Sequence, residues 1–222
     1  MSKPLRKRMT REESRAQTFE RLLDSARDLF GHRGIEATSI EEVAEAAGYS
    51  RGAFYSNFKS KDDLICAVLK RELRIANESV AEILEMEVNP AQREAFRQYY
   101  IRFCSDEKGC LLWAGMHIYA IQNLEIRPQV AKLFRENRIK LTEAASSVLG
   151  ELHRHGTPLP FKPEDFFLAL IAQAFGLSLA HLLDPESLSI DELREALALN
   201  FDRLTREDLL PPAPKPQTPT GV

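Results

Sequence analysis

A short segment, Ser50 to Lys61, concentrates side chains that can contact phosphate oxygens and the edges of nucleobases. Arg51 and Asn57 offer hydrogen-bonding groups that match base edges. Tyr55 and two lysines suit the oxygens of a phosphate backbone. Between them, a glycine and an alanine add almost no side-chain bulk, which permits close approach of another molecule.

Helix signals on both sides of this segment predict how it is positioned. Ser39 and Glu42 have the spacing of a capping box, which starts a helix. Gly48 stops that helix, and Ser50 is a plausible N-cap for the next. Residues 38–61 therefore predict a helix-turn-helix, whose second helix enters the major groove by its N-terminal end. Many helical proteins contain a glycine-broken helix pair, so this geometry alone leaves simple helix packing open.

The wider N-terminal region favours a DNA-binding helix-turn-helix over simple helix packing. The run from Phe30 to Leu64 closely resembles the TetR family of regulators, and the resemblance covers roughly residues 15–66, the rest matching only in layout. The matching features are Leu29-Phe30-Gly31, Gly34-Ile35, Thr38-Ser39, Val43-Ala44, Ala47-Gly48-Tyr49-Ser50, Phe54-Tyr55, Phe58 and Lys59-Ser60-Lys61.

The resemblance implies that three helices form a DNA-binding head and that a long fourth helix joins the head to a sensor body. It also implies a set of DNA-facing positions. These are Thr38, Ser39, Ser50, Arg51, Gly52, Ala53, Tyr55, Ser56, Asn57, Lys59 and Lys61. Two alternatives stay open at single positions: Tyr55 could pack within the head, and Lys61 could face only solvent.

Composition and charge fit this division. Residues 1–61 hold 12 Lys/Arg against 9 Asp/Glu, a net charge of +3, whereas the remainder holds 18 against 24, a net charge of −6. A basic head on an acidic body suits a chain that places only its head on a polyanion. A chance distribution of surface charge is the alternative.

Apolar spacing predicts an all-α fold of about nine helices. The expected organisation is a basic disordered arm (1–14), a three-helix head (15–60), a helical effector-binding and dimerisation body (61–207) and a proline-rich disordered tail (208–222). In the body we expect helices near 61–87, 90–107, 111–124, 128–155, 163–183 and 190–206.

The last two predicted helices suggest a dimer. The first is apolar on more than one face, so it must be covered on more than one side, and the second carries a stripe at coiled-coil-like spacing. The family resemblance implies a four-helix interface built from these helices, and a homodimer on a near-palindromic operator. The predicted interface residues are Ala172, Phe175, Gly176, Leu179, Ala180, Leu183, Leu193, Leu197 and Phe201. A monomer that buries both stripes internally is the alternative.

An aromatic-rich region in the body suggests a pocket for a small hydrophobic or aromatic effector. The candidate lining residues are Tyr100, Phe103, Trp113, Met116, His117, Phe134 and Phe175. Aromatic side chains at helical spacing are more often core, and that alternative applies to each of them.

Other function classes find little support. The three cysteines form no CxxC motif, which fits a reducing, cytoplasmic location, and neither a secretory signal nor a membrane span is expected. No nucleophile–base pair, phosphate-binding loop or metal cluster is apparent, so we expect no catalytic site, metal or cofactor. The prediction is a DNA-binding repressor released by its effector. A ligand-independent or protein-responsive regulator is the alternative, and a helical enzyme is a remote third.

Overall fold

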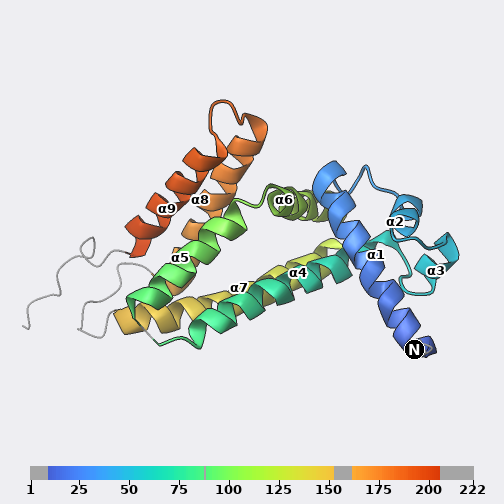
Figure 1. The fold of residues 1–222 in the computed structure, drawn as a ribbon, viewed down its shortest axis with the longest axis horizontal. Helices are drawn as coiled ribbons and strands as arrows, with labels where there is room; N and C mark the ends of the chain where they lie inside the picture. The colour runs from blue at the N-terminus through green and yellow to red at the C-terminus, as the bar shows by residue number, and fades with distance from the viewer. Residues whose placement is uncertain (1–9, 88, 153–161, 206–222) are drawn as a thin grey trace, which may run out of the picture. The chain divides into compact units, whose positions relative to one another are not determined.

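The computed structural model describes residues 10–87, 89–152 and 162–205, which form nine α-helices and no strand (Figure 1). This confirms the all-α prediction. In chain order they are α1 (Arg11–Arg33), α2 (Ile40–Ala46), α3 (Arg51–Tyr55), α4 (Lys61–Leu84), α5 (Pro90–Cys104), α6 (Glu107–Gln122), α7 (Arg127–Leu152), α8 (Pro163–Leu183) and α9 (Ile190–Thr205). The tail predicted at 208–222 and most of the arm predicted at 1–14 lie outside the described residues.

The first helix begins earlier than its apolar pattern does. Thr10 is its N-cap: the Thr10 side chain accepts a hydrogen bond from the Glu13 N–H at 3.1 Å, and the Glu13 carboxylate accepts one from the Thr10 N–H at 2.7 Å. Residues 11–14, predicted to belong to the arm, are therefore helical, and that part of the prediction was wrong. The first turn has no apolar residue, so only the capping box signals it.

The chain divides into two compact units. The first comprises the chain up to Arg74 together with 108–133, and the second comprises 75–107 and the chain from Phe134. The expected boundary after residue 60 differs from this division, because the first unit also takes the start of α4 and most of α6.

In the first unit, α6 packs closely against the end of α1. A Cβ atom added to Gly31 would lie 3.1 Å from the carbonyl oxygen of Lys108, tighter than almost any real contact. Gly31 does not end the first helix, because α1 continues to Arg33 and is capped by Gly34 at φ 80°. The small size of Gly31 instead permits the approach of α6.

The second unit has a core built from α5, α8 and α9. Its buried members are Tyr100, Cys104, Leu170, Ala174, Leu193, Leu197 and Phe201. Polar atoms inside it are paired: the Tyr100 hydroxyl donates to the Leu170 carbonyl at 3.1 Å, and the Ser178 hydroxyl lies 2.6 Å from the Cys104 carbonyl oxygen. Arg93 and Arg97 both contact the Asp202 carboxylate and so tie α5 to α9.

This core corrects part of the predicted dimer interface. Leu193, Leu197 and Phe201 are 1%, 0% and 6% exposed and pack inside their own protomer. The stripe on α9 is therefore used to hold α9 on α5 and α8, and these three residues are not available to a partner.

The dimer-interface residues predicted on α8 differ from those on α9, because most of them are exposed. Ala172, Gly176, Leu179 and Ala180 are exposed, Leu183 is 87% exposed, and Phe175 is partly buried. This helix thus keeps an apolar surface that the described residues of the chain do not cover. Among the described helices, none is long and apolar enough to cross a membrane.

Candidate nucleic-acid interface

The helix α2 is firmly fixed at its N-terminus. The Ser39 side chain accepts from the Glu42 N–H at 3.2 Å, and the Glu42 carboxylate accepts from the Ser39 N–H at 2.8 Å. The Ser39 backbone and hydroxyl donors, and then Arg33 at 2.9 Å, lower the pKa of Glu42 below its ordinary value. The predicted capping box is confirmed, and the Ser39 hydroxyl is engaged in it.

A tight glycine turn joins α2 to α3. Gly48 adopts φ 78°, which a side chain would strain. The Tyr49 N–H donates to the Ala44 carbonyl at 2.8 Å and the Gly48 N–H donates to the Glu45 carbonyl at 2.9 Å. This is the hydrogen-bond pattern of a Schellman motif, and it sets the direction in which α3 leaves α2.

The short helix α3 presents one face to the core and the other to solvent. Ser50 caps it by accepting from the Ala53 N–H at 3.3 Å. Phe54 is fully buried, whereas Tyr55 is 46% exposed, with its ring edge-on to Phe54 at a centroid distance of 5.3 Å. Tyr55 is therefore anchored by its neighbour without being covered, which answers the alternative that it packs inside the head.

Arg51, the first residue of α3, is held between a carboxylate and a ring. Its Nη1 lies 2.9 Å from Oε1 of Glu41, and its Cζ lies 5.5 Å from the centroid of the Tyr55 ring. A hydrogen bond to Tyr55, followed by the negative charge of Glu41, raises the pKa of Arg51 further. The guanidinium is exposed and remains charged at any pH of interest.

Three predicted contact residues serve the backbone instead. The Ser56 hydroxyl donates to the Gly52 carbonyl at 3.0 Å, and the Asn57 amide donates to the Ala53 carbonyl at 2.8 Å, so both satisfy the last carbonyls of α3. Thr38 is 1% exposed and donates to the Gly34 carbonyl at 2.8 Å. We correct the role assigned to Thr38, which is buried, and revise that of Asn57, which is half-buried with its amide engaged.

The lysines that follow α3 differ in their surroundings. Lys59 is exposed, and its backbone N–H donates to the Asp63 carboxylate at 3.0 Å. The Nζ atom of Lys61 lies 5.9 Å from the ring centroid of Tyr119. Lys59 thus keeps an exposed ammonium group beside α3, whereas Lys61 is partly covered by α6.

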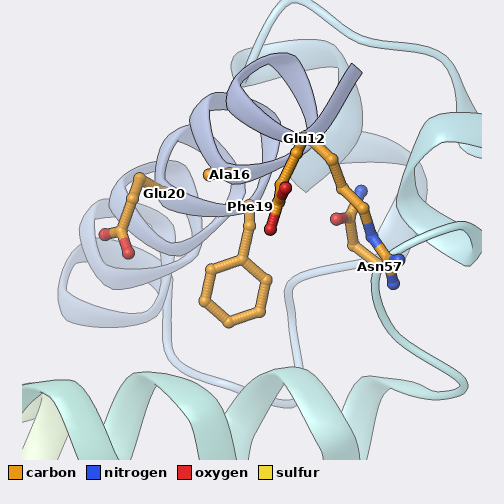
Figure 2. A pocket seen from close by; sticks show the side chains of 6 residues that line it. Glu12, Ala16, Phe19, Glu20 and Asn57 are labelled. Atoms are coloured by element: carbon orange, nitrogen blue, oxygen red, sulfur yellow. The ribbon is translucent and has the colours of Figure 1, made fainter. Parts of the chain in front are cut away.

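Beside α3, the N-terminal half of α1 borders an open depression of about 360 Å³ (Figure 2). Its lining residues are Glu12, Arg15, Ala16, Phe19, Glu20 and Asn57. Figure 2 shows Phe19 between Glu20 and Asn57. None of the predicted effector residues lines it, and its carboxylates suit an apolar ligand poorly.

The predicted effector residues have varied surroundings. Tyr100 belongs to the core of the second unit, where its hydroxyl accepts from the Asn200 amide at 2.9 Å. Phe103 is 38% exposed and stacks on Tyr99 at 5.9 Å. Phe134 and Phe175 are partly buried in the same unit.

The other three effector candidates lie on α6 in the first unit. Met116 is 1% exposed, Trp113 is partly buried, and His117 is exposed with its Nδ1 2.8 Å from the Trp113 carbonyl oxygen. For Tyr100 and Met116 the core alternative describes their surroundings, and a common pocket for the seven residues stays a prediction.

Two further residues lie at this candidate interface and are not among the predicted DNA-facing positions. Glu41 pairs with Arg51, and Nη2 of Arg15 on α1 donates to the Ser56 carbonyl at 3.2 Å, just after α3. The capping box places Glu41 in the first turn of α2, but its partner depends on how α2 crosses α3. Arg15 is far from Ser56 in sequence, so no local spacing reveals that contact.

Comparisons with known proteins bear on this same region. The family model described as "Bacterial regulatory proteins, tetR family" matches residues 22–68. The chain is 26% identical over 141 residues to the transposon Tn10 TetC protein of Escherichia coli, covering 58% of this chain and 72% of that protein. It is 43% identical over 61 residues to the transcriptional regulator AcrR of Shigella flexneri, covering only 28% of each.

Among solved structures, NalD of Pseudomonas aeruginosa, the secondary repressor of the MexAB-OprM multidrug efflux pump, aligns with a TM-score of 0.64. The alignment covers 89% of this chain and all of NalD at 23% identity, so it supports the fold. The family model matches the segment that contains α2, the glycine turn and α3. The chain is thus similar to the TetR family of bacterial regulatory proteins over residues 22–68.

Proposed function

We propose that this protein is a DNA-binding transcriptional repressor that acts as a homodimer and leaves its operator when a small molecule binds its body. One observation carries the DNA-binding part. The helix α3, capped by Ser50 and anchored by Phe54, exposes Arg51, Gly52 and Tyr55 on one surface. Relatives whose names describe transcriptional regulators and repressors support the direction of regulation.

The chemistry of this surface fits a DNA groove. An arginine at the start of a helix can contact guanine through two hydrogen bonds, and the tyrosine hydroxyl and Lys59 can contact phosphates. Adding a Cβ atom to Gly52 would bring it no nearer than 3.6 Å to the Ser50 Oγ. Because the protein itself does not require glycine there, we assign the missing side chain to close approach of DNA.

For the dimer, the exposed apolar face of α8 supplies the surface. Ala172, Gly176 and Ala180 recur every fourth residue, and Leu179 and Leu183 flank them. Small residues let two helices approach closely, and burying exposed leucines is favourable. A twofold dimer places two heads on half-sites about one DNA turn apart, so the operator is near-palindromic.

The effector part rests on the aromatic and apolar side chains of the body, with Trp113 and His117, one turn apart on α6, as the leading candidates. A hydrophobic or aromatic effector suits them. Release requires that the effector and DNA favour different conformations, with a coupling of about 1–3 kcal/mol. The repressor acts where the DNA is, so we place it in the cytoplasm.

Selection of bound duplexes from a random pool tests the DNA-binding proposal. We expect enrichment of a near-palindromic sequence, and loss of its binding in Arg51→Ala and Tyr55→Ala, each by about tenfold or more. Lys140→Ala is the matched control, because it removes an exposed cation from α7 and should leave affinity almost unchanged. If no sequence is enriched, the proposal is wrong.

Native mass spectrometry and gel shifts test the effector. Small hydrophobic and aromatic compounds that bind the dimer by mass should lower its affinity for the enriched duplex. Bound compounds that leave this affinity unchanged would favour the ligand-independent or protein-responsive regulator instead.

A further inference from the structure

Glu41 occupies an unexpected place for a residue of a DNA-binding surface. It lies in the first turn of α2, and its Oε1 is 2.9 Å from Nη1 of Arg51. Both side chains are well exposed, at 64% for Arg51 and 54% for Glu41. The negative charge of a carboxylate at this position offsets the positive charge of the arginine and repels phosphates. It therefore lowers the general attraction of the head for DNA.

The capping of α2 does not account for this carboxylate. Ser39 and Glu42 form the cap, and Glu42 also pairs with Arg33 at 2.9 Å. Stability does not account for it either, because an ion pair between two exposed side chains contributes little to folding. The contact with Arg51 is therefore best explained by what it does to Arg51.

Two neighbours contact the guanidinium of Arg51. Glu41 takes the Nη1 end, and the Tyr55 ring lies 5.5 Å from Cζ. The ring is itself fixed edge-on to the buried Phe54. The edge formed by Nε and Nη2 is the one that Glu41 does not contact, and a pair of parallel N–H donors matches O6 and N7 of guanine.

We propose that Glu41 is a specificity-determining residue, which orients Arg51 toward a guanine and disfavours docking on DNA that offers only phosphates. This inference rests on the proposed function of α3. It assigns the two residues one joint role: Arg51 supplies the base contact, and Glu41 makes that contact selective. Specificity arises here partly from repulsion of the wrong partner.

The test compares binding of the enriched duplex with binding of a scrambled duplex of the same length. In Glu41→Gln the affinity for scrambled DNA should rise, and the ratio between the two affinities should fall by about tenfold. Glu45→Gln removes the same charge from an exposed position on the same helix, and it should keep the wild-type ratio. Thermal unfolding of each variant verifies that the head remains folded.

Two further variants separate orientation from charge. Glu41→Asp keeps the charge but withdraws it from Arg51, so the ratio should fall although affinity for scrambled DNA stays near wild type. In Arg51→Ala, adding Glu41→Gln should lower the ratio no further, because the two residues act as a unit.

The outcomes are distinct. A wild-type ratio in Glu41→Gln or Glu41→Asp, or an equal fall in Glu45→Gln, overturns the role of Glu41. Failure of the wild-type protein to prefer any sequence instead overturns the proposed function of α3.

Discussion

At the scale of single residues, polar side chains around α3 divide into those that hold the backbone and those that face outward. Ser50, Ser56 and Asn57 satisfy the ends of the helix. Arg51 and Tyr55 remain exposed, whereas Phe54 is buried. A helix of five residues cannot be stable by itself, so the first group keeps the second in position.

The capping box of α2 predicts a dependence on acid. The pKa of Glu42 is lowered in the folded state, mainly by the Ser39 N–H, so its stabilising effect is present above the ordinary pKa of 4.5 and is lost as the pH falls through the lowered value. Glu42→Gln should therefore flatten the decline of unfolding free energy as the pH falls from neutral through the lowered pKa, measured by urea denaturation. Ser39→Ala should cost about 0.5–2 kcal/mol at pH 7, and an unchanged acid response in both variants would contradict this assignment.

A substitution at Gly52 should affect stability and DNA binding differently. A Cβ atom at this helical position meets open space apart from the Ser50 Oγ at 3.6 Å, and alanine is the better helix former. Gly52→Ala should leave stability unchanged or raise it by up to about 1 kcal/mol, while weakening operator binding by about tenfold or more. A melting curve with a gel shift measures both effects, and a variant that binds as well as wild type would show that DNA does not approach this backbone.

At the scale of elements, the way each helix packs decides which of its faces is buried in the core and which is exposed. The helix α9 directs Leu193, Leu197 and Phe201 into the core of its own unit. The helix α8 contributes Leu170 and Ala174 to that core and leaves a second apolar face exposed. Of the two helices predicted to form the dimer interface, α8 therefore offers the larger uncovered apolar surface.

Leucines on α9 should respond to truncation according to their burial. Leu197 is 0% exposed, and Leu197→Ala should lower the unfolding free energy by about 2–5 kcal/mol, because the cavity adds to the lost apolar burial. Leu199, two residues along the same helix and 51% exposed, provides the control, and Leu199→Ala should cost less than about 1 kcal/mol. Equal losses in urea denaturation of the two variants would contradict the assignment of the α9 core face.

At the scale of the whole molecule, assembly and charge determine how the protein meets DNA. The net positive charge of residues 1–61 and the net negative charge of the rest direct a polyanion to the head. In the proposed dimer two heads contact one duplex, and tight binding then depends on the exposed face of α8.

Charge on that face should dissociate the dimer without unfolding the chain. Leu179 and Leu183 are 38% and 87% exposed within the protomer, so Leu179→Arg and Leu183→Arg leave the protomer core unaltered. Sedimentation should show monomers with an unchanged helical circular dichroism spectrum, and operator affinity should fall by more than tenfold. Leu168→Arg, at a 46% exposed site two turns or more before Gly176, tests how far the interface extends, and dimers that survive the first two substitutions would refute this surface.

Salt should weaken the complex steeply. Each phosphate that the head neutralises adds about 0.9 to the slope of log affinity against log salt concentration. Titration of the enriched duplex at several salt concentrations should give a steep negative slope. In Lys59→Ala the slope should be shallower, by the amount that corresponds to about one lost phosphate contact per dimer half. A flat response would mean that the head does not contact the backbone as proposed.

The sequence by itself determined the local features of this protein. Apolar spacing predicted the all-α fold, and the capping box at Ser39 with the glycine at position 48 predicted the start and end of α2. These signals involve residues within one or two helical turns, so they need no knowledge of distant neighbours. The same local information placed Arg51 and Tyr55 on a short helix.

Only the tertiary structure decided which of the suitable side chains are available. Thr38 is buried and Asn57 is bonded to its own helix, although both residue types can contact DNA. Glu41 meets Arg51, and Leu197 lies in a core shared by α5, α8 and α9. Each of these outcomes depends on how helices cross, and that packing joins residues far apart in the chain, which periodicity along one helix cannot specify.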